Sequence, residues 1–436
     1  MDFEIYSRLL ELYKENPVVS TDSRKLPKGC IFFALKGPSF DGNQFAAKAL
    51  ENGAGYVVID DEKVRKELGE NPRVIYVHNA LKALQELARL YREDLAIPVI
   101  GIGGSNGKTT TKELLKEVMA SRYKTHATEG NFNNHIGLPL TLLSMPADTE
   151  VAILELGTNQ EGDIAELVEI SEPDFGLITN IGKEHLEGFG SIEGVAREES
   201  ELFLYLMRHS GLAFVNMDDP WLEKMANKLN RVVSYGQDSS CSTSATLTGS
   251  FPGVSLELDS GIEVHSQLPG AYNFSNILAS FSIARHFDIP DWITKTAVES
   301  YVSQNNRSQV VSKNGYTFLL DCYNANPSSM KVALESLAQQ EGMKFFILGD
   351  MLELGAYEAE EHRTIVELLR HLNLENGIFI GPAFAKQLHG DARSFPDSQS
   401  AAAYLRDHPI PKDSLIFLKG SRGIAVEKAV AHLLQD

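Results

Sequence analysis

The sequence predicts an α/β protein, because short apolar runs of strand length alternate with segments of helical periodicity along the whole chain. Its length of 436 residues favours about three domains. We expect a small α/β domain over residues 1–94, a central domain with a mostly parallel sheet over 95–303, and a Rossmann-like domain over 304–436.

In the first domain, strand-like runs occur at residues 31–35, 56–59 and 74–77, and helical stretches cover 46–52 and 80–95. Apolar side chains of the last stretch recur at helical intervals. One face of that helix is therefore expected to be buried.

Two polar segments of this domain stand at predicted strand ends, where α/β domains place ligand contacts. One is Thr21, Asp22, Ser23 and Arg24, and the other contains Gly37. An aspartate, a serine and an arginine together can bind a sugar hydroxyl and a phosphate. The same residue types are common turn formers, so the sequence leaves both interpretations open.

The central domain begins with an apolar run at 98–102 that leads into glycines and then into a helical pattern starting at Lys108. A strand, a glycine-rich turn and a helix start form the phosphate-binding loop of a P-loop-type domain, which favours nucleotide binding but does not name a reaction. Lys108 would reach the β- and γ-phosphates, and the Thr109 hydroxyl would bind Mg²⁺. Ile102 stands where the usual spacing has a glycine, so an ordinary strand-to-helix turn is the alternative.

Two later strands of the central domain are also followed by polar side chains. The run at 151–154 leads to Glu155, and the run at 175–179 leads through a polar segment to His185. A carboxylate at the end of a strand, in the same sheet as a phosphate loop, can hold Mg²⁺. A single histidine is more often a surface or capping residue, but its place at the same predicted sheet edge favours a functional role.

The strand pattern changes afterwards: residues 245–267 indicate short β-strands, and a helix over 274–287 carries Asn276. The last segment has apolar strand candidates, separated by helical patterns, at 316–320, 344–348, 377–380 and 414–418. This alternation predicts right-handed crossovers and a mostly parallel sheet. Polar groups follow three of these strands, at 321–327, 349–355 and 419–423. Ligands of open α/β sheets bind there, although each loop alone fits a capped turn.

Composition restricts the partners. The net charge of −19 disfavours nucleic acid and anionic membranes. No apolar stretch is long enough for a membrane helix, and no secretory leader is evident. The three cysteines are scattered without metal-ligand spacing, which predicts reduced thiols in a cytoplasmic protein. We expect a monomer that binds small molecules, without membrane insertion.

Together these motifs resemble the Mur ligases of bacterial cell-wall synthesis. The resemblance covers nearly the whole chain and is carried by the segments 104–110, 155–159, 185–191, 321–327, 349–351 and 419–422. The phosphate loop is similar to that of a wider group, which includes folylpolyglutamate synthases. The segments 185–191 and 323–327 resemble the branch that adds D-alanyl-D-alanine.

The resemblance implies a substrate domain for a UDP-sugar, a central ATPase domain and a C-terminal domain that closes over ATP and the dipeptide. It implies UDP-sugar contacts at Thr21, Asp22, Ser23, Arg24 and Gly37. It implies ATP contacts at Gly104, Ser105, Asn106, Gly107, Lys108, Thr109, Thr110, Asn276, Arg307 and Asp321. It implies Mg²⁺ ligands at Thr109, Glu155 and His185, and a C-terminal face near the dipeptide with Asn324, Asn326, Lys419, Ser421 and Arg422.

The implied activity joins D-alanyl-D-alanine to UDP-N-acetylmuramoyl-tripeptide, with ATP and Mg²⁺ as cofactors. A carboxylate is a poor acylating agent, so transfer of the γ-phosphoryl group would first make an acyl phosphate. The amine of the dipeptide would then attack the activated carbonyl. Domain closure would keep the acyl phosphate from water.

Two positions depart from the family pattern. Family members generally carry a carbamoylated lysine that bridges Mg²⁺, and the matching position here is Glu199. We hypothesise that Glu199 replaces the carbamate, and count it with Lys108, Glu155 and His185 as a catalytic residue. The alternative is a solvated acidic helix face over 198–201. The second departure is Tyr272, where the family has a histidine.

Two other functions are compatible with the sequence. A sister ligase, or a folate-type ligase, would use the same chemistry with a different acceptor, but the segment 323–327 and the full N-terminal domain argue against it. A regulator or scaffold that binds ATP without ligation is suggested only by the missing lysine. The presence of Lys108, Thr109, Glu155 and His185 argues against this second function.

Overall fold

The computed structural model describes residues 2–304, 306–388, 391 and 393–435. The chain forms two compact units: the first comprises Met1–Gly101, Tyr123–Thr158 and Gly162–Phe175, and the second comprises Ile102–Arg122, Asn159–Glu161 and Gly176–Asp436. In the part of the chain that the structure describes, no helix combines the length and apolar character needed to cross a membrane.

The first unit begins with a four-stranded parallel sheet in the order β1-β2-β5-β6. Its strands are β1 (Val19–Ser20), β2 (Ile31–Phe33), β5 (Tyr56–Ile59) and β6 (Val74–Tyr76). Its helices are α1 (Asp2–Glu15), α2 (Ala46–Glu51), α3 (Glu62–Leu68) and α4 (Ala80–Leu95), and a small hairpin pairs β3 (Lys36–Gly37) with β4 (Phe40–Asp41) before a 3₁₀ turn at Gly42–Phe45.

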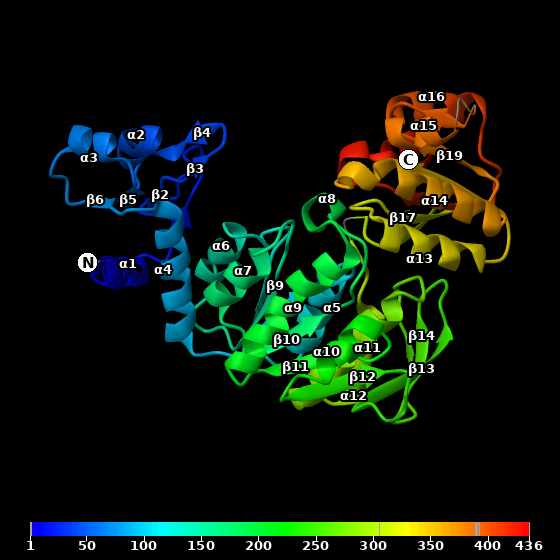
Figure 1. The fold of residues 1–436 in the computed structure, drawn as a ribbon, viewed down its shortest axis with the longest axis horizontal. Coiled ribbons are helices and arrows are strands. Elements are labelled where there is room, and N and C mark those ends of the chain that lie inside the picture. The colour runs from blue at the N-terminus through cyan, green and yellow to red at the C-terminus, as the bar shows by residue number, and fades with distance from the viewer. Residues whose placement is uncertain (1, 305, 389–390, 392, 436) are drawn as a thin grey trace. The chain divides into compact units, whose positions relative to one another are not determined.

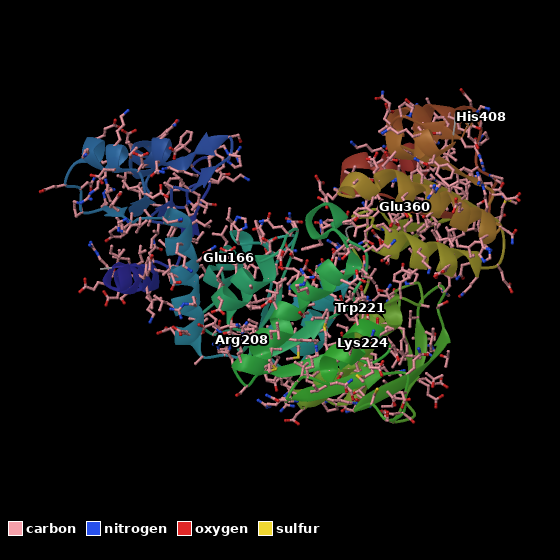
Figure 2. The ribbon with its side chains drawn as sticks, viewed as in Figure 1. Glu166, Arg208, Trp221, Lys224, Glu360 and His408 are labelled. Atoms are coloured by element: carbon pink, nitrogen blue, oxygen red, sulfur yellow. The ribbon has the colours of Figure 1, made fainter. Side chains whose placement is uncertain are left out.

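Helix α4 shows why the sequence pattern was informative. Asn79 caps its start by accepting a hydrogen bond from the Lys82 N–H at 2.9 Å. Its apolar face is buried, as predicted, through Leu84, Leu87, Ala88 and Tyr91. The same helix carries the buried Gln85, which donates a 2.8 Å hydrogen bond to Glu166 on α7 (Asp163–Ser171; Figure 2).

The remainder of the first unit consists of β8 (Thr125–Ala127), α6 (Gly137–Leu143) and β9 (Val151–Glu155), with α7. Strands β8 and β9 are parallel, and helices α6 and α7 both pack on α4. Strand β9 ends at Glu155, so the carboxylate stands at the carboxyl end of a fully buried strand, as the sequence predicted.

The first part of the second unit starts at the end of β7 (Val99–Gly103). It contains strands in the order β15-β14-β13-β12-β11-β10: β10 (Phe175–Ile178), β11 (Leu212–Asn216), β12 (Val232–Gly236), β13 (Thr243–Gly249), β14 (Ser255–Leu258) and β15 (Glu263–His265). Its helices are α5 (Lys108–Ala120), α8 (Leu186–Phe189), α9 (Ile192–Arg208), α10 (Pro220–Ala226), α11 (Asn273–His286) and α12 (Asp291–Ser300). Strands β11, β12 and β13 are parallel, whereas β14 and β15 form an antiparallel extension. Helices α5, α11 and α12 pack against one another (Figure 1).

The last part of the chain forms a six-stranded sheet in the order β16-β17-β21-β18-β19-β20. All its pairs are parallel except that of β16 with β17. The strands are β16 (Gln309–Lys313), β17 (Tyr316–Asp321), β18 (Lys344–Gly349), β19 (Gly377–Ile380), β20 (Ser394–Phe395) and β21 (Leu415–Lys419). The α-helices are α13 (Pro327–Ala338), α14 (Glu358–His371), α15 (Pro382–Leu388), α16 (Ser398–Asp407) and α17 (Ala431–Leu434), with 3₁₀ turns at Gly355–Tyr357, Arg422–Ile424 and Val426–Val430.

Both faces of this last sheet are covered. Alternate residues of one strand enter different cores: Phe346 and Leu348 of β18 belong to one apolar cluster, and Ile347 belongs to the other. Strands that are buried on both faces appear in a sequence as continuous apolar runs. The expected Rossmann-like architecture of this segment is confirmed.

Candidate functional site

The phosphate-loop candidate joins β7 to α5, and steric contacts explain why two of its positions are glycine. Gly104 has a φ of +112°, and a Cβ at this position would collide with the Thr179 hydroxyl and lie 2.6 Å from the Thr179 backbone nitrogen. Gly107 has a φ of +85° and precedes the first residue of α5. A Cβ there would lie 2.7 Å from Oδ1 of Asn276. The fold therefore brings the predicted ATP contact Asn276, on α11, against the loop.

The loop is held by the segment that follows β10. The Ser105 N–H donates to the Asn180 carbonyl at 2.9 Å, and the Gly182 N–H donates to the Ser105 hydroxyl at 2.8 Å. The Thr179 hydroxyl donates to the Asn106 carbonyl at 2.7 Å. These bonds fix the entrance to α5, and the first turn of a helix is a favourable site for an anionic phosphate.

Three charged side chains meet at this loop. Lys108 Nζ donates a hydrogen bond to the Gly104 carbonyl and lies 3.7 Å from Oε2 of Glu184. Oε2 of Glu199, which comes from α9, accepts a 2.6 Å hydrogen bond from the Gly104 N–H. The exposed fractions of Glu184 and Glu199 are only 3% and 0%. The solvated acidic face considered for 198–201 is therefore wrong at Glu199, and also at Glu198, which is buried.

Burial shapes the charge state of the two carboxylates. It raises the pKa of Glu199 to about 8, with the Lys108 charge acting in the opposite direction and Glu184 adding to the rise. Burial also raises the pKa of Glu184, again against the charge of Lys108 and then of His185. Each glutamate has one buried oxygen, Oε1, with no hydrogen-bond partner among the described residues.

These orphaned oxygens test whether the residues fit Mg²⁺. Mg²⁺ prefers oxygen ligands and is commonly held by one or two carboxylates together with substrate phosphates. Two buried carboxylate oxygens beside a phosphate-loop candidate fit that donor set. Within the described ranges, no group of three or more His, Cys, Asp and Glu side chains could hold a metal ion alone. Nucleotide phosphates and water would supply the other ligands.

Two other predicted metal ligands have defined surroundings. Glu155, in the first unit, is buried, and its Oε1 accepts a 2.9 Å hydrogen bond from Asn133. His185 precedes α8 with a φ of +41°, and its Nδ1 lies 2.7 Å from Oε2 of Glu353. This bond lowers the pKa of Glu353. Thr109, the remaining predicted ligand, is buried in the first turn of α5.

The structure brings several of the predicted C-terminal residues together. Lys419 on β21 is 3% exposed and donates a 2.5 Å hydrogen bond to Asp321 on β17, because the two residues are register partners in adjacent strands. The guanidinium carbon of Arg307 lies 3.5 Å from the ring centroid of Tyr323. Stacked arginine and tyrosine form a flat surface of the kind that can receive a nucleobase.

Asn326 connects this part to the phosphate loop. Its side chain accepts a hydrogen bond from the Ser329 N–H and caps α13, and its Nδ2 donates to Asn106 Oδ1 at 2.8 Å. The Ser421 hydroxyl accepts a 2.9 Å hydrogen bond from the Leu352 N–H.

The last two of the predicted C-terminal residues contact residues close to them in sequence. The Asn324 side chain accepts a hydrogen bond from the N–H of the next residue. Arg422 is largely exposed and lies 3.6 Å from Glu427.

The predicted UDP-sugar segment forms a tight turn. The Arg24 N–H and guanidinium both donate to the Asp22 carboxylate at 2.9 Å, and these bonds lower the pKa of Asp22 to about 2. Thr21 and Ser23 are half-buried beside them. Gly37 lies in the β3–β4 hairpin, where a Cβ would lie 2.5 Å from the ring of Phe40. The turn is thus present, and the ligand role of these residues stays a prediction.

Glu184 and Glu353 are the charged residues of this site that the sequence analysis did not select. Glu184 stands directly before His185, in a segment already singled out as polar. A carboxylate next to a candidate metal ligand was the signal that could have identified it. Glu353 lies in the polar segment 349–355 after β18. Nothing local distinguished it from its neighbours, because its partner His185 is distant in sequence.

Family models match three successive parts of the chain. Residues 17–92 match the family model described as Mur ligase family, catalytic domain; residues 102–284 match the Mur ligase middle domain; and residues 306–422 match the Mur ligase, glutamate ligase domain. The UDP-N-acetylmuramoyl-tripeptide–D-alanyl-D-alanine ligase of Bacillus subtilis is 34% identical, over 96% of this chain and 93% of that protein. The protein of the same name from Escherichia coli is 31% identical, over 96% and 94%.

Solved structures agree. MurF from Acinetobacter baumannii superposes with a TM-score of 0.86 and 29% identity, covering 96% of this chain and 93% of that chain. The MurF ligase from Thermotoga maritima, solved with ADP, gives a TM-score of 0.86 and 26% identity, covering 95% and 96%. Because the three domain models and the full-length relatives agree, this chain belongs to the Mur ligase family.

Proposed function

We propose that this protein joins D-alanyl-D-alanine to UDP-N-acetylmuramoyl-tripeptide at the expense of ATP, in the cytoplasmic stage of peptidoglycan synthesis. One observation carries the proposal: the chain matches ligases of that name over 96% of its length at 31–34% identity. The loop also has Lys108 at the start of α5, where a phosphate-binding lysine is expected.

The reaction has two steps. An oxygen of the tripeptide carboxylate attacks the γ-phosphorus of ATP, which forms an acyl phosphate and releases ADP. The amine of the dipeptide then attacks the acyl carbon, inorganic phosphate leaves, and the amine nitrogen loses a proton as the amide forms. Mg²⁺, when bound, would offset the negative charge of the phosphates.

The side chains of this protein support the first step through charge and position. Lys108 is half-buried near two carboxylates and the Gly104 carbonyl, so its ammonium is poised to move onto the phosphates when they arrive. A preorganised cation near the transferred group stabilises the developing charge. Gly104, Ser105, Asn106, Gly107, Thr109 and Thr110 would surround the phosphates, and Asn276, Arg307 and Asp321 would contact the adenosine.

The remaining assignments follow the family plan and are part of the proposal. Residues 1–94 would bind the UDP-sugar through Thr21–Arg24 and Gly37. Residues 95–303 would bind ATP, with Thr109, Glu155 and His185 as Mg²⁺ ligands and Glu199 in place of a carbamate. Residues 304–436 would close over ATP and hold the dipeptide near Asn324, Asn326, Lys419, Ser421 and Arg422. The protein would act as a monomer without nucleic-acid partners.

The test measures the release of inorganic phosphate from ATP in bicarbonate-free buffer that contains Mg²⁺ and UDP-N-acetylmuramoyl-tripeptide. The assay is run with and without D-alanyl-D-alanine. Release that requires the dipeptide is the expected result. Release with a single amino acid instead would assign a sister ligase, and no release under any condition would favour a binding protein without ligase activity. Release only after bicarbonate is added would refute the role given to Glu199.

A further inference from the structure

The Lys108 site contains a second buried carboxylate that the proposed function has not used. Glu184, like Glu199, lies beside Lys108 and has an Oε1 without a hydrogen-bond partner in the described part of the chain. Leaving a buried polar atom unpaired costs on the order of 1–3 kcal/mol, and more for a charged one. Two such atoms at one lysine indicate that a ligand completes the site.

The backbone is shaped around Glu199. A Cβ on Gly103 would lie 2.6 Å from Glu199 Oε2, so only glycine leaves room for the carboxylate at this point of the chain. The Gly104 N–H then holds the same oxygen at 2.6 Å. One oxygen of Glu199 is thereby fixed by the loop, and the other remains available.

The charges of the site call for a cation. Glu184 and Glu199, when ionised, carry two negative charges against the single positive charge of Lys108. Without a cation, the ionised form of both carboxyls would be costly and would repel the triphosphate that the loop is built to receive. A divalent cation reverses the sign, and oxygen donors are the ligands that Mg²⁺ prefers.

We propose that Glu184 is a carboxylate ligand of the divalent cation that accompanies the nucleotide, acting together with Glu199. This inference rests on the proposed function for the identity of the nucleotide. Glu184 would bind the cation through Oε1 while its Oε2 stays near Lys108.

The experiment measures binding of Mn²⁺ to the full-length protein in the presence of ADP, by the electron paramagnetic resonance signal of free Mn²⁺. The variants are Glu184→Gln and Glu199→Gln, and Glu193→Gln is the matched control, because Glu193 lies exposed on α9. Both test variants should bind Mn²⁺ about 10- to 100-fold more weakly than the wild type. The control should bind as the wild type does.

Thermal melting without metal separates a ligand role from a structural one. Removing the charge of a buried carboxylate should leave the melting temperature unchanged or raise it, whereas loss of a structural contact would lower it. Unchanged Mn²⁺ affinity in Glu184→Gln would overturn the proposal, as would weakened affinity accompanied by a lowered melting temperature without metal.

A crystal of the wild-type protein with ADP and Mn²⁺ decides the matter if a variant fails to fold. An anomalous peak within about 2.0–2.3 Å of both Glu184 and Glu199 would support the proposal, and a peak that contacts Glu199 alone would refute it. Neither measurement uses the UDP-sugar or the dipeptide. A different acceptor would therefore change the proposed function and leave the cation result intact.

Discussion

The pKa of Glu199 gives a stability prediction with a defined sign. Its carboxyl is fully buried, and burial raises the pKa from an ordinary 4.5 to about 8. A group whose pKa is raised on folding binds its proton more tightly in the folded state, so it stabilises below pH 4.5 and this contribution is lost as pH rises to about 8. The difference between the two pKa values corresponds to at most about 5 kcal/mol.

Glu199→Gln removes the titration and keeps the shape of the side chain. In metal-free buffer, the variant should become more stable than the wild type as pH rises from 5 to about 8, and the gap should be constant above that range. Melting temperatures of both proteins at several pH values, with EDTA present, measure this gap. A gap that does not change with pH, or a variant that is less stable at the upper end, would refute the reasoning.

Three further predictions concern the phosphate-loop candidate and Asn326, which contacts it. Lys108→Ala should lower kcat/KM for ATP about 100- to 1,000-fold, while Lys116→Ala, two turns along α5, should leave it unchanged; equal effects would contradict the role of Lys108. Gly104→Ala should lower the melting temperature and weaken ADP binding, because the added Cβ would strike Thr179. Gly162 is the control: its φ of +97° is similarly positive, but a Cβ there would meet open space, so Gly162→Ala should lower the melting temperature less. Asn326→Ala should destabilise α13 by about 1 kcal/mol, as measured by unfolding, because it removes a helix cap; no change in stability would argue against the cap.

Much of the fold was predictable because it depends on patterns within single segments. The helix predicted at 80–95 has the same limits as α4, and the strand predicted at 377–380 coincides with β19. Short elements were harder: β1, β3 and β4 have only two residues each. Two residues show no periodicity, and their pairing depends on neighbours that the sequence alone does not place.

Site prediction succeeded in selecting segments and was weaker for pairs of residues. The loop at Lys108 was found because its glycines and helix start are adjacent in sequence. The contacts of Lys108 with Glu184 and of Gly104 with Glu199 join positions that are 76 and 95 residues apart. Such contacts depend on how α9 and the segment after β10 pack against the loop, and no local pattern records this.

The burial of Glu199 shows why a local pattern was misleading there. Helix α9 carries Glu198, Glu199 and Glu201 in close succession, and a run of acids on a helix usually indicates a solvated face. Val195 and Leu202 are buried on the same helix as Glu199. The Glu199 carboxylate is therefore buried together with the apolar side chains of α9. A charge placed on the buried side of an amphipathic helix needs a compensating group. Here that group is the loop N–H of Gly104, with Lys108 nearby, and the other oxygen of Glu199 has no hydrogen-bond partner among the described residues.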